Sequence, residues 1–132
     1  MPDPSFQPGF RLSATDVVIL IIGTGAAAYV FTIDRWFGVA IAFIVLHFFF
    51  FCNILRMSRL LELIWAGAFA GLAFATFAFG LPWPGVFGIA TGLTALFAGL
   101  HAKHPSYHGV GWKKLNPRLP EWWHAARSDQ NP

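Results

Sequence analysis

Four long apolar runs, each of about 17 to 20 residues, account for most of this 132-residue chain. They cover residues 16–32, 36–55, 60–79 and 84–100. At a rise of about 1.5 Å per residue, a helix of that length crosses a hydrocarbon core about 30 Å thick. Because 56% of the residues are hydrophobic and only 11% are charged, a soluble domain of this size would expose much of its apolar surface. The runs therefore predict a membrane-spanning protein.

Helices rather than strands are expected, because lipid offers the backbone no hydrogen-bond partner and the runs do not alternate apolar with polar residues. The connections are very short, which places consecutive helices antiparallel. Ser13 and Asp16 have the spacing of a capping box at the start of the first helix. The sequence predicts an all-α integral membrane protein. Residues 1–15 lead into four transmembrane helices in an up-and-down antiparallel bundle over residues 16–100, and residues 101–132 form an interfacial C-terminal tail.

Lysine and arginine gather on one side of the predicted bundle. The loop after the second run holds Arg56 and Arg59, whereas the opposite side has Arg35 beside Asp34 and an uncharged turn at residues 80–85. The tail supplies the further cations Lys103, Lys113, Lys114, Arg118 and Arg127. The positive-inside rule then places both termini in the cytoplasm, and we predict a multi-pass protein of a bacterial inner membrane.

The tail mixes tryptophan with basic residues at a density typical of a membrane surface. The expected interfacial anchors are Trp112, Lys113, Lys114, Trp122 and Trp123. Their apolar parts suit the acyl boundary and their polar ends suit the lipid headgroups. A disordered tail and a tail docked on a soluble domain of a partner are the alternatives.

Small residues recur at four-residue intervals in the third run, at Gly67, Gly71 and Ala75, and in the fourth run, at Gly88 and Gly92. Such spacing lets two helix backbones approach closely in lipid. We interpret these positions as helix-packing faces. Their partner is either a neighbouring helix of the same chain or another subunit, and the spacing does not distinguish the two.

His47 is the only ionisable residue in the interior of any predicted span, and Asn53 lies nearer the end of the same run. A polar group at membrane depth is a functional candidate because lipid makes it costly. His47 has the chemistry to ligate a haem or a chlorin, or to hydrogen-bond a neighbouring carbonyl as a packing residue. The other histidines lie at the end of the fourth run or in the tail, so a bis-histidine haem is not expected. No cofactor is predicted beyond this single-histidine option.

A polar cluster of Arg56, Arg59 and Glu62 is expected at the cytoplasmic end of the second and third runs. In the simpler interpretation, Glu62 pairs with one of the arginines across the tight turn and latches the two helices together. In the alternative, the two arginines bound a site for a lipid phosphate or a quinone headgroup.

Several classes of function have no support in the sequence. His101, His104 and His108 are close in sequence but lack an acidic or thiolate neighbour, so no metal site is predicted. The sequence shows no pattern of a nucleophile with its base, of paired carboxylates or of a phosphate-binding glycine loop, so no catalytic residue and no enzyme activity are predicted. The basic residues are few and adjoin apolar runs, so nucleic acid is not an expected partner.

Three functions remain. The favoured one is a small non-catalytic integral membrane subunit or accessory protein that packs into a larger membrane complex, respiratory or photosynthetic. Its partners would be the lipid bilayer and either other membrane subunits or a second copy of the chain. The second is a small transporter or channel, although carriers of protons or cations usually need a carboxylate in mid-membrane and these spans have none. The third is a pigment- or haem-binding redox subunit that uses His47.

Overall fold

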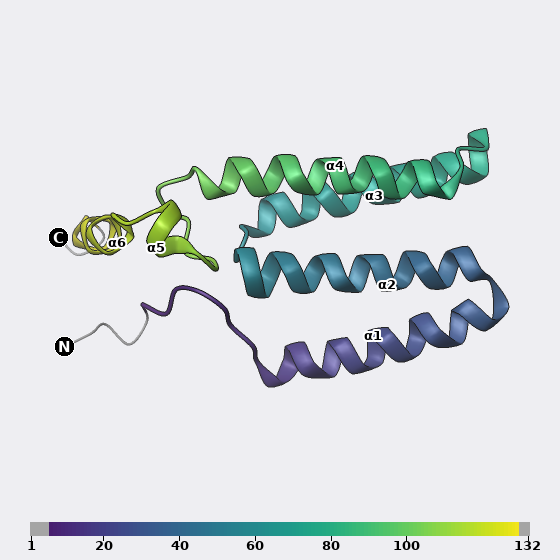
Figure 1. Cartoon of the computed structure of the whole chain (residues 1–132), viewed down its shortest axis with the longest axis horizontal. Coiled ribbons are helices and arrows are strands. Elements are labelled where there is room, and N and C mark those ends of the chain that lie inside the picture. The colour runs from purple at the N-terminus through teal and green to yellow at the C-terminus, as the bar shows by residue number, and fades with distance from the viewer. Residues whose placement is uncertain (1–5, 130–132) are drawn as a thin grey trace.

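A computed structural model describes residues 6–129, and this part of the chain forms helices and no strand (Figure 1). The long helices are α1 (Ala14–Ile33), α2 (Arg35–Phe49), α3 (Arg59–Phe79) and α4 (Trp83–Ala102). A π-helix, η1 (Phe50–Leu55), continues α2, and the shorter helices α5 (Trp112–Leu115) and α6 (Leu119–Ser128) follow α4. Figure 1 shows α1 folded back along α2 and α4 lying along α3. The outermost residues of both predicted terminal segments lie outside the described range.

Within residues 6–129, four helices are long and apolar enough to cross a membrane, when α2 is taken together with η1. The chain is therefore a multi-pass membrane protein. Each helix begins one or two residues before its predicted start and ends at most two residues after its predicted end. The prediction is wrong in one respect, because residues 50–55 were expected to be α-helical and instead form a π-helix.

Local side chains explain where the first two helices begin. The predicted capping box is confirmed: the Asp16 N–H donates to Ser13 Oγ at 3.2 Å, and the Ser13 N–H donates to Asp16 Oδ2 at 2.8 Å. Asp34 caps α2 in a similar way, since its Oδ1 accepts from the N–H groups of Trp36 and Phe37. A cap of this kind lets α2 begin with only Asp34 between it and the end of α1.

The α1–α2 pair packs closely because glycine removes side chains at two crossing points. At Gly23 an added Cβ would lie 2.6 Å from a Val45 methyl, and at Gly38 it would lie 2.5 Å from the Phe31 Cα. Both separations are shorter than real carbon contacts, so only glycine allows this approach. Ala27, on the same face of α1 as Gly23, is 7% exposed.

An aromatic core joins α2, α3 and α4. Trp65 of α3 is 1% exposed and stacks on His47 of α2 at 4.9 Å and on Phe69 at 5.4 Å between ring centroids. Its indole N–H donates to Thr94 Oγ1 of α4 at 3.0 Å. Buried indoles need such a partner, and here the partner comes from the neighbouring helix.

The N-terminal segment and the start of the tail meet at the end of η1. The last carbonyls of a helix have no partner within it, and outside donors satisfy two of them. Asn53 O accepts from the Arg11 N–H at 3.2 Å, and Ile54 O accepts from the Val110 N–H at 2.7 Å. Gly109 lies against this carbonyl end, where an added Cβ would approach Ile54 O to 2.6 Å. The described tail residues therefore include a folded cap on this end of the helices.

Candidate functional site

Two adjoining hollows lie where α1 begins and η1 ends, and they form the candidate site. The apolar hollow has a volume of about 310 Å³ and the polar hollow about 370 Å³. Cys52 and Arg59 line both. Volumes of this size are at the lower end of the range for small-molecule pockets, about 300 to 1,000 Å³.

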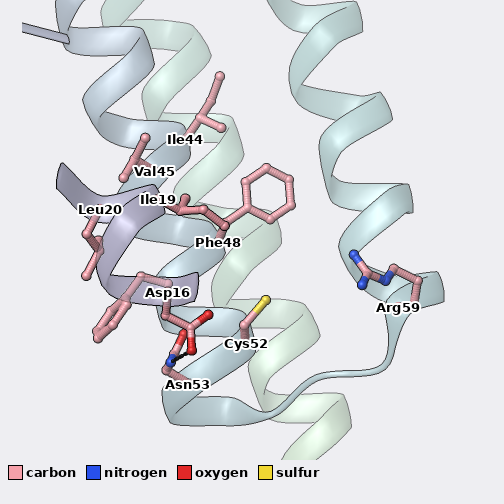
Figure 2. Close-up of a pocket in the computed structure, with 10 residues that line it drawn as sticks. Asp16, Ile19, Leu20, Ile44, Val45, Phe48, Cys52, Asn53 and Arg59 are labelled. Carbon is pink, nitrogen blue, oxygen red and sulfur yellow. Dashed lines mark hydrogen bonds between the residues drawn. The ribbon is translucent and has the colours of Figure 1, made fainter. Parts of the chain in front are cut away.

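Aliphatic and aromatic side chains of α1 and α2 make most of the apolar hollow. The hydrophobic lining residues are Ile19, Leu20, Ile44, Val45, Phe48 and Phe49. Figure 2 shows Phe48 and Cys52 pointing from the second span toward Arg59, across the space between that span and α3. The hollow is therefore lined by α1, by the second span and by Arg59 at the start of α3.

Asp16 and Asn53 form the polar end of the apolar hollow. Asp16 Oδ2 accepts from the Ser13 N–H and hydroxyl and from Asn53 Nδ2 at 3.1 Å. Asn53 is only 2% exposed, and its amide also donates to the Arg11 carbonyl. The predicted polar candidate Asn53 thus ties the N-terminal segment to the end of η1.

Glu62 is a buried carboxylate in the lining of the polar hollow, at 4% exposure. Its Oε1 accepts from Cys52 Sγ at 3.0 Å, which links α3 to η1, and its Oε2 lies 3.7 Å from Arg59 Nη1 within α3 itself. Arg56 instead donates to the Gln7 carbonyl. Burial, aided by the nearby charge of Arg11, lowers the pKa of Arg56. Arg56 and Arg59 therefore line the same hollow but have different partners, and the link from Glu62 to the second span is made by a cysteine.

The polar hollow combines the turn after η1 with the end of α4 and the tail. Its lining includes Arg56, Glu62, His101, Ser106 and His108. His101 is 8% exposed. The Leu55 and Arg56 carbonyls lie near its ring, yet its Nε2 atom makes no hydrogen bond within the described residues. A buried polar atom without a partner is unusual enough to need an explanation.

His47 lies deeper in the second span. Its Nδ1 donates to the Phe43 carbonyl at 2.8 Å, which leaves Nε2 as the acceptor in the neutral ring. Trp65 stacks on the ring, and a separate hollow of about 300 Å³ lies beside it, lined also by Leu46 and Thr94. The hydrogen bond to Phe43 is what a packing histidine makes, and it also orients the free nitrogen as a ligand would need.

The predicted helix-packing glycines face away from the rest of the chain. An added Cβ at Gly67, Gly71, Gly88 or Gly92 would meet no atom of the described chain within 4 Å. Ala75 is partly buried. No neighbouring helix of the described chain therefore fills these four positions.

The predicted interfacial anchors are divided between the cap and the surface. Trp112 and Trp123 each contact the Phe6 ring, at 6.0 and 5.4 Å between centroids. The Lys113 ammonium lies 6.0 Å from the Trp112 ring centre, within reach of a cation–π contact. Lys114 is exposed, and Trp122 is 38% exposed. Trp122 and the two lysines are the anchors that reach the surface.

Sequence reasoning missed Cys52, Asp16 and His101 as members of this site. Asp16 was expected only as a helix cap, and His101 only as one of three histidines that are close in sequence. The missing information is tertiary, because the site forms where three helix ends and the tail meet. One available signal was that polar residues in the first or last turn of several spans share one membrane side.

Among the described residues, no three His, Cys, Asp or Glu side chains are grouped to hold a metal ion. A scan against protein-family models and searches of curated proteins and of solved structures found no match to this chain.

Proposed function

We propose that this chain is a small non-catalytic membrane subunit that packs into a larger membrane complex through the outward glycine face of α4. We define this face by Gly88, Gly92, Ala95 and Gly99. All four are exposed, and the three glycines have open space where a Cβ would stand. In lipid, small residues favour association because they let another backbone approach closely. This open glycine face is the observation that carries the proposal.

The outer face of α1 gives the contrast expected of a helix that meets lipid alone. It presents bulky aliphatic side chains such as Ile21 and Ile22, which are 68% and 66% exposed. Branched side chains fill the space among acyl chains but keep another helix at a distance. Gly25 of α1 is also open, but it lies one turn from the exposed Ile21 and Ile22, whereas the α4 face has small residues on successive turns. This difference supports a partner on α4 and lipid on α1.

The topology that goes with this proposal is an up-and-down antiparallel bundle with both termini in the cytoplasm of a bacterium. Arg56 and Arg59 lie at the same end of the helices as the basic tail, which supports this orientation. Trp122 and the exposed lysines of the tail would then lie at the level of the lipid headgroups, beside the folded cap on the ends of the helices.

Replacement of one glycine tests the proposal. In Gly92→Leu the isobutyl group should fill the groove, so that the partner no longer copurifies when native membranes are extracted in mild detergent. Gly25→Leu is the matched control, because Gly25 of α1 also has nothing within 4 Å of its Cβ position. Quantitative mass spectrometry of the extracts should show a stoichiometric protein lost only with Gly92→Leu. Equal recovery with both variants would contradict the proposal.

A pigment- or haem-binding subunit is the second candidate, and the free Nε2 of His47 favours it. A chain purified in mild detergent would then absorb visible light, and His47→Ala would remove the band. A transporter is less supported, since Asp16 and Glu62 lie in the first turns of their helices rather than in mid-membrane.

A further inference from the structure

We propose that the two adjoining hollows bind one anionic phospholipid, with an acyl chain in the apolar hollow and the phosphate in the polar hollow beside Arg59 and His101. This site is separate from the glycine face of α4 and does not depend on the subunit role.

The order of the two hollows along the helices matches the order of polarity in a lipid. The apolar hollow is lined by Ile19 and Leu20 of α1 and by Ile44 and Phe48 of α2, all within membrane-spanning helices. The polar hollow lies at the ends of the helices, against the turn after η1 and the tail. A molecule that occupies both must be apolar at membrane depth and polar at the surface.

The hollows adjoin each other, because Cys52 and Arg59 belong to the lining of both. Figure 2 shows Cys52 between Asp16 on one side and Arg59 on the other. In the proposed complex, one phospholipid lies across the Cys52 side chain, with its acyl chain in the apolar hollow and its headgroup in the polar hollow.

The charges of the polar hollow favour an anion. Arg56 and Arg59 carry two positive charges against the single negative charge of Glu62. Glu62 is already occupied by the Cys52 thiol and by a contact of 3.7 Å to Arg59. The Arg59 side chain is 82% exposed and has five N–H donors, so it keeps donors for a phosphate.

The carboxylate of the apolar hollow does not oppose this assignment. Asp16 accepts hydrogen bonds from Ser13 and Asn53, which satisfy its carboxylate, and it lies on the other side of Cys52 from Arg59. His101 supplies the remaining polar group, because its buried Nε2 atom has no hydrogen-bond partner in the described chain. A phosphate oxygen would provide one.

The test measures lipid affinity of the full chain alone, delipidated in mild detergent and titrated with defined lipids under native mass spectrometry. The probes are dioleoyl phosphatidylglycerol, dioleoyl phosphatidylcholine and water-soluble glycerol 3-phosphate. We expect phosphatidylglycerol to bind about tenfold more tightly than phosphatidylcholine, a difference of about 1.4 kcal/mol. Glycerol 3-phosphate should not compete at equal concentration.

Two variants separate the halves of the site. Arg59→Gln should remove the preference for phosphatidylglycerol, whereas Arg35→Gln, at the opposite end of α2, should keep it. Ile19→Trp should weaken binding of both lipids by filling the apolar hollow, whereas Ile21→Trp, at a residue of the same helix that lines neither hollow, should not. Circular dichroism checks that each variant keeps its helix content.

Each other outcome overturns the proposal. Equal affinity for the two lipids would show that the site does not recognise an anionic headgroup. A preference for phosphatidylglycerol that is unchanged in Arg59→Gln would show that Arg59 does not bind that headgroup. Competition by glycerol 3-phosphate would reveal a site for a free anion. Tighter binding of phosphatidylcholine would assign the hollows to a zwitterionic lipid. Loss of the partner in Gly92→Leu leaves this measurement untouched, so the two proposals fail separately.

Discussion

The two helix pairs of this protein differ in whether glycine lies at the contact between their helices. In the α1–α2 pair, Gly23 and Gly38 face the neighbouring helix and allow close packing within the chain. In the α3–α4 pair, Gly67, Gly88 and Gly92 face outward onto open space. The comparison shows that the spacing of small residues indicates close approach but does not identify the approaching helix.

The α3–α4 pair is held by different contacts. Trp65 fills the space between the helices and donates from its indole to Thr94 and to the Ala90 carbonyl. The outward faces of both helices are then free to carry glycine without loss of internal packing. We therefore expect loss of an aromatic side chain to destabilise the α3–α4 pair. Gain of a methyl group should instead destabilise the α1–α2 pair.

The largest effect is expected for Trp65→Ala, which removes the center of the aromatic core. Loss of a buried aromatic side chain costs about 3 to 5 kcal/mol in the free energy of unfolding. SDS titration of the protein in mixed micelles measures this change. Trp122→Ala, at a tryptophan that is 38% exposed, is the control and should change stability little. Equal effects of the two variants would show that α3 and α4 do not depend on this core.

The next effect is expected for Gly38→Ala. The new methyl would lie 2.5 Å from the Phe31 backbone, so α1 must move away from α2, at a cost of about 1 to 3 kcal/mol. Gly25→Ala makes the same chemical change in open space and should be neutral or stabilising by about 0.5 to 1 kcal/mol. The same SDS titration compares them. A destabilised Gly25→Ala with an unaffected Gly38→Ala would reverse the assignment of the two faces.

The smallest effect is expected for Thr94→Val, which keeps the side-chain shape but removes the acceptor of the Trp65 indole. Hydrogen bonds between membrane helices contribute on average about 0.6 kcal/mol and at most about 1.7. Thr91→Val is the matched control, because the Thr91 hydroxyl donates only within its own helix, to the Phe87 carbonyl. A shift in tryptophan emission should accompany the loss of stability in Thr94→Val alone.

The long helices could be predicted from the sequence because their signals are local. Run length and hydropathy located the four spans, and the pairing of Ser13 with Asp16 located the start of α1. The π-helix was missed, because nothing in Phe50–Leu55 departs from an ordinary apolar helix. It forms where Arg56 adopts a left-handed backbone and carbonyls of η1 find donors in the N-terminal segment and the tail.

The candidate site was predicted only in part for a related reason. Glu62 and Arg59 are neighbours on one helix, so their proximity follows from helix periodicity. The contact of Cys52 with Glu62 joins two helices, and the burial of His101 depends on the tail folding back. Such contacts depend on how the helices pack, which a single sequence does not specify.

The central claim is that the outward glycine face of α4 receives another protein. A photoreactive amino acid at Leu96, which is 54% exposed and adjoins Ala95 of this face, tests it directly in native membranes. The same group at Ile21 of α1, 68% exposed, is the reference. We predict one discrete protein adduct from position 96 and only lipid adducts from position 21. Lipid adducts alone from both positions would contradict the account.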